Sequence, residues 1–166
     1  MVITLIGMSG AGKSAIAAPL ARLLGGEVVD VDALIEVKIG ESLPELLAKR
    51  GDEEFLRIES EVIRALNPKP DSIIATGGSA VLIPEAMEHL RKISRIVYLA
   101  VPFKTIECRR GTGAESSIVG IGSKTLQEIY DERLPLYKKY ADVVVDAASG
   151  SSRDVAERVR AAVIKN

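Results

Sequence analysis

Short apolar runs alternate along the chain with longer stretches in which apolar positions recur every three or four residues. A continuous apolar run of strand length is typical of a buried parallel strand, because helices cover both faces of such a sheet. The pattern predicts five strands, at Val2–Ile6, Glu27–Val31, Ser72–Thr76, Ile93–Val101 and Val143–Val145.

Helices are predicted between these strands and after the last one. Ser42 followed by Glu45 is a capping box, and Gly25 suits the end of the first helix. The predicted helices are Lys13–Leu24, Asp32–Ile39, Ser42–Leu66 with a break near Gly51, Pro84–Arg91, Pro102–Arg109, Lys124–Tyr140 and Arg153–Lys165. Alternating strands and helices predict one three-layer α/β domain over residues 1–166, with a mostly parallel sheet.

Composition excludes several classes of partner. The 22 basic and 23 acidic residues nearly cancel, and aromatic residues make up only 4% of the chain, so neither a nucleic-acid surface nor a membrane partner is expected. No apolar run approaches the roughly 20 residues of a membrane span. The first residues lack the features of a signal peptide, and we expect a cytoplasmic protein. Cys108, the single cysteine, is interpreted as a small buried residue.

The clearest motif follows the first predicted strand. Residues Gly7–Ser14 read GMSGAGKS and match the phosphate-binding pattern G-x-x-x-x-G-K-[ST] in full, between a strand and a helix. In such a loop the backbone N–H groups surround a phosphate, and the helix start adds partial positive charge. Lys13 is expected to reach the β- and γ-phosphates of ATP, and Ser14 to bind Mg²⁺.

Polar residues also follow the other strands, where ligands of parallel α/β sheets gather. Asp30 and Asp32 are candidates to support Mg²⁺ and to accept the proton of an attacking hydroxyl; Asp32 alternatively only caps a helix. Gly77-Gly78-Ser79 allows the backbone to approach a ligand. Arg109-Arg110 is a candidate phosphate or adenine contact, whereas Arg133 alone reads as ordinary surface.

Several of these residues occur in a combination that resembles the shikimate kinase family, within the nucleoside-monophosphate-kinase-like proteins. The resemblance runs from Val2 to about Asp146. It is carried by the P-loop, Asp30-x-Asp32, Ile35-Glu36, Gly51-Asp52-Glu53-Glu54-Phe55, Glu59, Ala75-Thr76-Gly77-Gly78 and Arg133-x-Pro135-x-Tyr137.

The resemblance implies five parallel strands in the order 2-3-1-4-5, cytoplasmic amino-acid biosynthesis and a monomer. It implies a lid at about 111–123 that closes over ATP. Its implied roles are ATP binding by Gly10, Ala11, Gly12, Lys13, Ser14, Ala15 and Arg110, Mg²⁺ binding by Ser14 and Asp30, catalysis by Lys13 and Asp32, and acceptor binding by Asp32, Gly78, Ser79 and Arg133.

Three positions depart from the family pattern. Leu56 stands where the family has an Arg that holds the shikimate carboxylate; the candidate replacement, Arg57, is rotated by about 100° along the helix. Ser79 replaces a third Gly. The lid lacks its usual Arg-Pro-Leu-Leu run, and Ser116-Ser117-Ile118-Val119 stands near that place.

The resulting hypothesis is an ATP-dependent kinase that phosphorylates a hydroxyl of a small carboxylic acid, with shikimate as the default acceptor. One alternative is a kinase for another hydroxylated acid, such as a hydroxy amino acid, with Arg133 on its carboxylate and Glu59 on its ammonium. The other alternative, suggested by the altered lid, is a non-catalytic relative that binds nucleotide and regulates a partner.

Overall fold

The five predicted strands form one parallel sheet in the computed structural model of the chain, which describes residues 1–110 and 118–164. The sheet order is β2-β3-β1-β4-β5, as expected. Its strands are β1 (Ile3–Ile6), β2 (Val28–Asp30), β3 (Ile73–Ala75), β4 (Arg95–Ala100) and β5 (Val143–Asp146). The middle strand, β1, is fully buried and pairs with β3 and β4, so its carboxyl end opens at the centre of the sheet.

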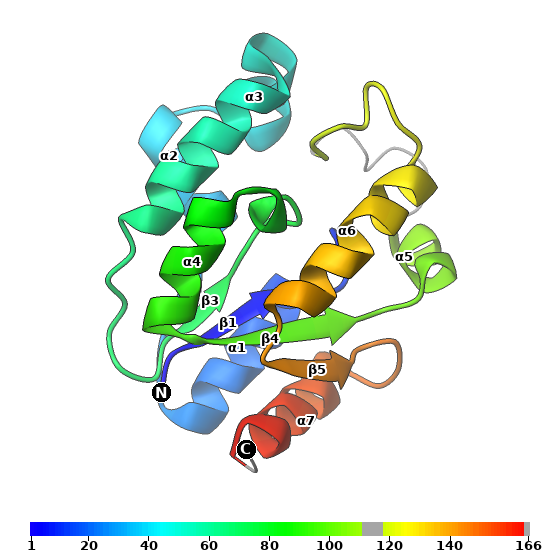
Figure 1. Cartoon of the computed structure of the whole chain (residues 1–166). Coiled ribbons are helices and arrows are strands. Elements are labelled where there is room, and N and C mark those ends of the chain that lie inside the picture. The colour runs from blue at the N-terminus through cyan, green and yellow to red at the C-terminus, as the bar shows by residue number, and fades with distance from the viewer. Residues whose placement is uncertain (111–117, 165–166) are drawn as a thin grey trace.

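Helices cover both faces of the sheet (Figure 1). The α1 and α7 helices pack together on one face, and α3 and α4 pack together on the other. The helices are α1 (Lys13–Leu24), α2 (Val31–Ile39), α3 (Leu43–Arg64), α4 (Pro84–Ile93), α5 (Phe103–Arg110), α6 (Leu126–Tyr140) and α7 (Ser152–Ile164). A short 3₁₀ turn, η1 (Ala80–Leu82), was not predicted.

Local signals in the sequence explain most helix ends, with one correction. The predicted capping box at Ser42 and Glu45 is present, and Gly51 interrupts α3 with a φ of 78°. However, α2 begins at Val31, one residue earlier than predicted, because Asp30 is its cap and accepts a hydrogen bond from the Ala33 amide at 3.2 Å. Asp32 therefore lies inside the first turn of α2, and its carboxylate is not the cap.

Two further features concern the single cysteine and the possibility of a membrane span. Cys108 is exposed rather than buried, because α5 turns Ile106 toward the core and leaves Cys108 on its outer side. Within the described residues, no helix has both the length and the apolar character needed to cross a membrane.

Aromatic stacking joins the sheet to α6. The rings of Tyr98 on β4 and Tyr137 on α6 are stacked, with centroids 5.2 Å apart and planes 12° apart. Burial raises the pKa of the Tyr137 hydroxyl, which donates a hydrogen bond to the Gly78 carbonyl at 2.7 Å. The stack therefore fixes α6 relative to the turn that follows β3.

The connection between α1 and β2 offers a test of the fold. An added Cβ at Gly26 would lie 1.7 Å from the Asp71 carbonyl oxygen, whereas Gly25, with a φ of 72°, has open space around it. We expect Gly26→Ala to lower the free energy of unfolding by more than about 3 kcal/mol, since the backbone must move. The matched Gly25→Ala should cost only about 1–2 kcal/mol of left-handed backbone strain. Urea denaturation of both variants checks this, and equal losses would contradict the described connection.

Candidate active site at the carboxyl end of the sheet

The predicted phosphate-binding loop joins β1 to α1 and closes around its own lysine. Gly7, Gly10 and Gly12 all have positive φ values, which side chains rarely tolerate. The Lys13 ammonium donates hydrogen bonds to the carbonyls of Gly7 at 2.8 Å and Met8 at 3.0 Å. Burial lowers the pKa of Lys13 to about 8, and the nearby Asp32 carboxylate opposes that shift.

The two candidate magnesium ligands are side by side. The Ser14 hydroxyl donates to the Asp30 carboxylate at 2.9 Å, at the point where α1 and α2 begin. Oxygen donors of this kind suit Mg²⁺, which usually takes one or two protein ligands and completes its shell with water and phosphate oxygens. Accordingly, the described residues contain no group of three or more His, Cys, Asp or Glu side chains that could hold a metal by themselves.

A small cavity lies beside the loop, on the side of β2 and β3. Its volume is about 50 Å³. Three of the predicted acceptor-binding residues, Gly78, Ser79 and Arg133, line it together with Asp32. The remaining wall is Ser9, Leu43, Phe55, Gly77, Ile118 and Val119. The structure thus brings together residues from six separate segments of the chain.

Glycines are required at the floor of this cavity. An added Cβ at Gly77 would lie 2.8 Å from Glu59 Oε1 and 2.9 Å from Asp32 Oδ1. An added Cβ at Gly78 would lie 3.0 Å from the Ser9 amide nitrogen and 3.4 Å from the Arg133 guanidinium. The glycine pair therefore lets two carboxylates, a guanidinium and the P-loop backbone converge on one turn.

Three buried charged side chains and one partly buried carboxylate surround the glycine pair. Lys13, Glu59 and Arg133 are at most 8% exposed, and Asp32 is the fourth member. Burial raises the pKa of Asp32, and the Lys13 ammonium opposes the shift. Burial also raises the pKa of Glu59, to about 7, against the hydrogen bond that it accepts from Ser79 at 2.6 Å. Lys13 and Arg133 therefore lie close to the carboxyl groups of Asp32 and Glu59, in surroundings that are largely shielded from water.

Part of the predicted lid closes the cavity. Ile118 and Val119 are buried, and the Val119 carbonyl accepts a hydrogen bond from the Arg133 guanidinium at 2.7 Å. The Gly120 amide donates to the Asp52 carboxylate at 3.0 Å, which joins this segment to α3. The rest of the expected lid, residues 111–117, lies outside the described residues, and Ser116 and Ser117 with it.

A separate hollow of about 160 Å³ lies on the opposite side of the P-loop. Arg109 borders it and holds the loop after β5 through hydrogen bonds to the carbonyls of Ala147 at 2.9 Å and Ala148 at 3.0 Å. Arg110, the predicted adenine contact, instead donates to the Ser9 hydroxyl and lies over Gly10. The hollow is lined by Gly10, Ala11, Gly12, Ala15, Ile16, Arg109, Ala147, Gly150, Ser152 and Val155.

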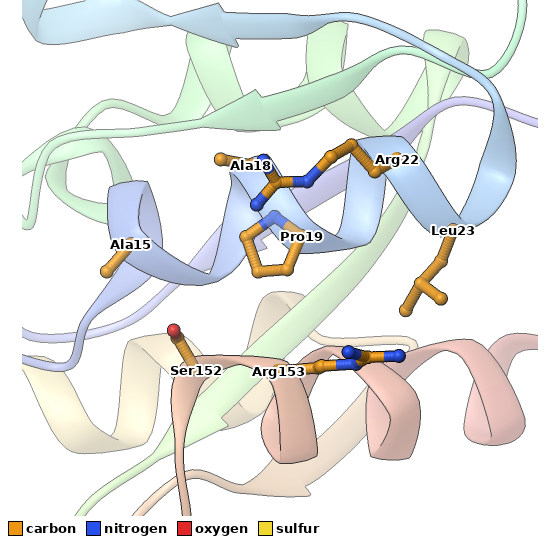
Figure 2. A pocket seen from close by; sticks show the side chains of 7 residues that line it. All are labelled: Ala15, Ala18, Pro19, Arg22, Leu23, Ser152 and Arg153. Carbon is orange, nitrogen blue, oxygen red and sulfur yellow. The ribbon is translucent and has the colours of Figure 1, made fainter.

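This hollow adjoins a wider one of about 470 Å³ between α1 and α7, and the two share Ala15 and Ser152. Figure 2 shows the two helices facing each other across it, with Arg22 lying along α1 and Arg153 on α7. The side of the P-loop that faces α7 therefore has room for a nucleoside, while the side that faces Asp32 is nearly filled.

Arg57 does not join the site. Its guanidinium is exposed and donates to Glu54 at 2.8 and 2.7 Å and to Glu61, on the outer side of α3. Leu56 and Arg57 both line another hollow, between α3 and the start of α4. The candidate replacement for the missing arginine is thus directed away from Arg133, as its rotation along the helix indicated.

Two contributors to the site were not predicted as such. Tyr137 occurs in the motif that contains Arg133, but its role in holding Gly78 depends on the fold of α6 against the sheet. Glu59 was considered only as a partner for an ammonium group. Its full burial could have been suspected from its spacing of four residues from Phe55, which places both on the inner face of α3.

Sequence and structure are similar to proteins of the same family. The family model described as shikimate kinase matches residues 9–163. A shikimate kinase of Halorhodospira halophila is 37% identical over 95% of this chain and 90% of its own length, and one of Thermodesulfovibrio yellowstonii is 35% identical over 95% and 91%. A solved shikimate kinase of Acinetobacter baumannii in complex with shikimate superposes with a TM-score of 0.90, at 30% identity, over 99% of this chain and 93% of that one.

The raised pKa of Glu59 predicts how stability depends on pH. The folded protein retains the Glu59 proton between pH 4.5 and about 7, while the unfolded chain releases it, so the free energy of unfolding falls as the pH rises through this range. This group alone contributes a fall of roughly 3 kcal/mol. In Glu59→Gln that part of the fall should be absent, which urea denaturation at pH 4.5 and pH 7 would show.

Glu61→Gln is the matched control, since Glu61 lies on the same helix but is exposed and paired with Lys38. This variant should keep the wild-type fall between pH 4.5 and 7. The same pH dependence in Glu59→Gln and in wild type would contradict the burial of an ionisable Glu59.

Proposed function

Because the chain belongs to the shikimate kinase family, we propose that it transfers the γ-phosphate of ATP to a hydroxyl of shikimate. The observation that supports this most is a cavity lined by Asp32 and Arg133, whose charges both act on Lys13 of the phosphate-binding loop beside it. Shikimate is a small carboxylic acid that carries hydroxyl groups. A phosphate-binding cation, a carboxylate base and a carboxylate-binding guanidinium are the groups that this transfer requires.

The P-loop and its neighbours bind the nucleotide. The backbone from Gly10 to Ala15 surrounds the phosphates, and the start of α1 adds its partial positive charge. The nucleoside occupies the hollow bordered by Arg109 and the loop after β5. Arg110 lies over Gly10, at the edge between this hollow and the phosphates, and contributes positive charge there.

Ser14 and Asp30 would hold Mg²⁺. When bound, the ion neutralises charge on the β- and γ-phosphates and orients them for in-line transfer. Asp30 is well placed for this because its other oxygen is fixed as the cap of α2, so the carboxylate has little freedom to turn away.

Asp32 accepts the proton of the attacking hydroxyl. The new bond forms between the acceptor oxygen and the γ-phosphorus, the bond from phosphorus to the bridging β,γ-oxygen breaks, and ADP leaves. Lys13 offsets the charge of the transferred group. Burial raises the pKa of Asp32, which makes its carboxylate a stronger base than an exposed one.

Arg133 binds the carboxylate of the acceptor, with Gly78 and Ser79 against the ring. In the described state the Arg133 guanidinium is occupied by the Val119 carbonyl, and the cavity of about 50 Å³ has room only for water, whose share of liquid volume is about 30 Å³. Ile118 and Val119 therefore withdraw when the acceptor enters. Arg57, held by two glutamates on the outside of α3, takes no part.

We assign one P-loop domain to residues 1–166, with the lid at about 111–123, acting as a cytoplasmic monomer in amino-acid biosynthesis. A hydroxy amino acid is the alternative acceptor, since only Arg133 among the described residues supplies a guanidinium to the cavity. An ADP-release assay with shikimate and a panel of hydroxy acids distinguishes these. Turnover with a hydroxy amino acid and none with shikimate would overturn the assignment, and no acceptor-dependent turnover would favour a regulatory nucleotide-binding protein.

The roles of Lys13 and Asp32 predict different defects. Lys13→Ala should abolish acceptor-dependent ADP release, because it removes the cation that contacts the transferred phosphate. Asp32→Asn should lower kcat by about 10²- to 10⁴-fold, the range for loss of a general base, with the KM for ATP little changed. Lys38→Ala, which removes an exposed lysine paired with Glu61, is the control and should keep wild-type kinetics. An undiminished kcat in Asp32→Asn would refute its assignment as the base.

A further inference from the structure

Ser79 places a hydroxyl at the wall of the acceptor cavity, and that hydroxyl already donates a hydrogen bond to a residue behind the wall. It lies between Gly78 and η1, is 5% exposed and lines the cavity. Its O–H donates to Glu59 Oε2 at 2.6 Å. A serine hydroxyl has one hydrogen to donate and two lone pairs that accept. With the hydrogen directed at Glu59, the side of Ser79 that faces the cavity offers only lone pairs.

The surroundings of Glu59 favour its hydrogen bond with Ser79. It is fully buried on α3, and its Oε1 has no hydrogen-bond partner in the part of the chain that the structure describes. Charged groups face it from three other elements: Lys13 on α1, Asp32 on α2 and Arg133 on α6. Among the described residues, the Ser79 hydroxyl is therefore the one hydrogen-bond donor to this carboxylate.

This arrangement makes the Ser79 side of the cavity a hydrogen-bond acceptor. The lone pairs of a carboxylate or ketone oxygen placed against Ser79 would face those of the serine oxygen, and no hydrogen bond would form. A hydroxyl or ammonium would instead donate a hydrogen bond to the serine oxygen. Arg133 presents the opposite polarity on the same cavity, since a guanidinium only donates. The acceptor should therefore bind with its carboxylate toward Arg133 and a donor group toward Ser79.

We propose that Ser79 determines specificity by accepting a hydrogen bond from a second, non-reacting hydroxyl of the acceptor, and that Glu59 is the positioning residue that fixes the direction of this bond. The proposal rests on the proposed function and narrows its substrate class to a carboxylic acid with at least two hydroxyl groups. One hydroxyl lies at Asp32 and is phosphorylated, and the other lies at Ser79.

The proposal is tested by comparing shikimate with analogues that each lack one of its non-reacting hydroxyl groups. In wild type, one analogue should lose about tenfold in kcat/KM, mainly through KM, which corresponds to one hydrogen bond of about 1–1.5 kcal/mol. Ser79→Ala should lose a similar factor on shikimate and nothing further on that analogue. Ser79→Thr, which keeps the hydroxyl, should restore the discrimination.

Ser94→Ala is the matched control, because it removes a hydroxyl just before β4, at the amino end of the sheet and away from the acceptor cavity. It should discriminate between the analogues as wild type does. If Ser79→Ala folds poorly, the pH dependence with which a ketone analogue binds still tests the proposal, because it is measured on wild type.

Glu59 is tested by pH. Because burial raises the pKa of Glu59 to about 7, the protonated side chain can donate to Ser79 below that pH and free the serine hydrogen for the cavity. An analogue with a ketone at the hydroxyl that faces Ser79 should therefore bind several-fold more tightly at pH 6 than at pH 8 by calorimetry. In Glu59→Gln this difference should vanish.

The outcomes separate the two proposals. Two results would overturn this inference and leave the kinase assignment intact. One is turnover of shikimate in which Ser79→Ala and the removal of each hydroxyl have independent effects on kcat/KM. The other is a ketone analogue whose affinity is the same at pH 6 and pH 8. Neither binding nor turnover of shikimate would overturn both.

Discussion

The site depends on four ionisable side chains that meet in one place, three of them buried and Asp32 partly buried. Lys13, Asp32, Glu59 and Arg133 come from four different helices and meet at the carboxyl end of the sheet. A single buried charge costs several kcal/mol, so none of the four would be tolerated there without the others. The two carboxylates approach the turn closely because Gly77 has no side chain, and an added Cβ there would displace both.

This compensation also connects the fold to the chemistry. The proposed transfer needs Lys13 as a cation beside phosphate and Asp32 as a base beside a hydroxyl, and the charge of each favours the ionised state of the other. The Tyr98–Tyr137 stack fixes α6, and through it the glycine turn that these charges surround. The described part of the lid then caps the same group, because the Arg133 guanidinium reaches a lid carbonyl at 2.7 Å.

Much of this could be predicted where the signal was local. The Gly7–Ser14 motif and the capping box at Ser42 depend on neighbouring residues, and both predictions of local structure are confirmed. The strand order came from resemblance. The charge cluster could not be predicted, because Arg133 on a polar helix looks exposed until α6 packs on the sheet. The cap of α2 is Asp30 and not Asp32, the candidate from the sequence, since either of two aspartates at the end of a strand can begin a helix.

Glu59 is the member of the cluster whose pKa lies nearest to neutral pH, and it accepts the hydrogen bond from Ser79 at the wall of the cavity. The most direct measurement is a ¹³C NMR titration of the Glu59 side-chain carboxyl, assigned through Glu59→Gln. We predict a titration near pH 7, well separated from that of exposed glutamates near 4.5. A Glu59 resonance that titrates together with the exposed glutamates would contradict the account that burial of this carboxyl outweighs the charges of Lys13 and Arg133.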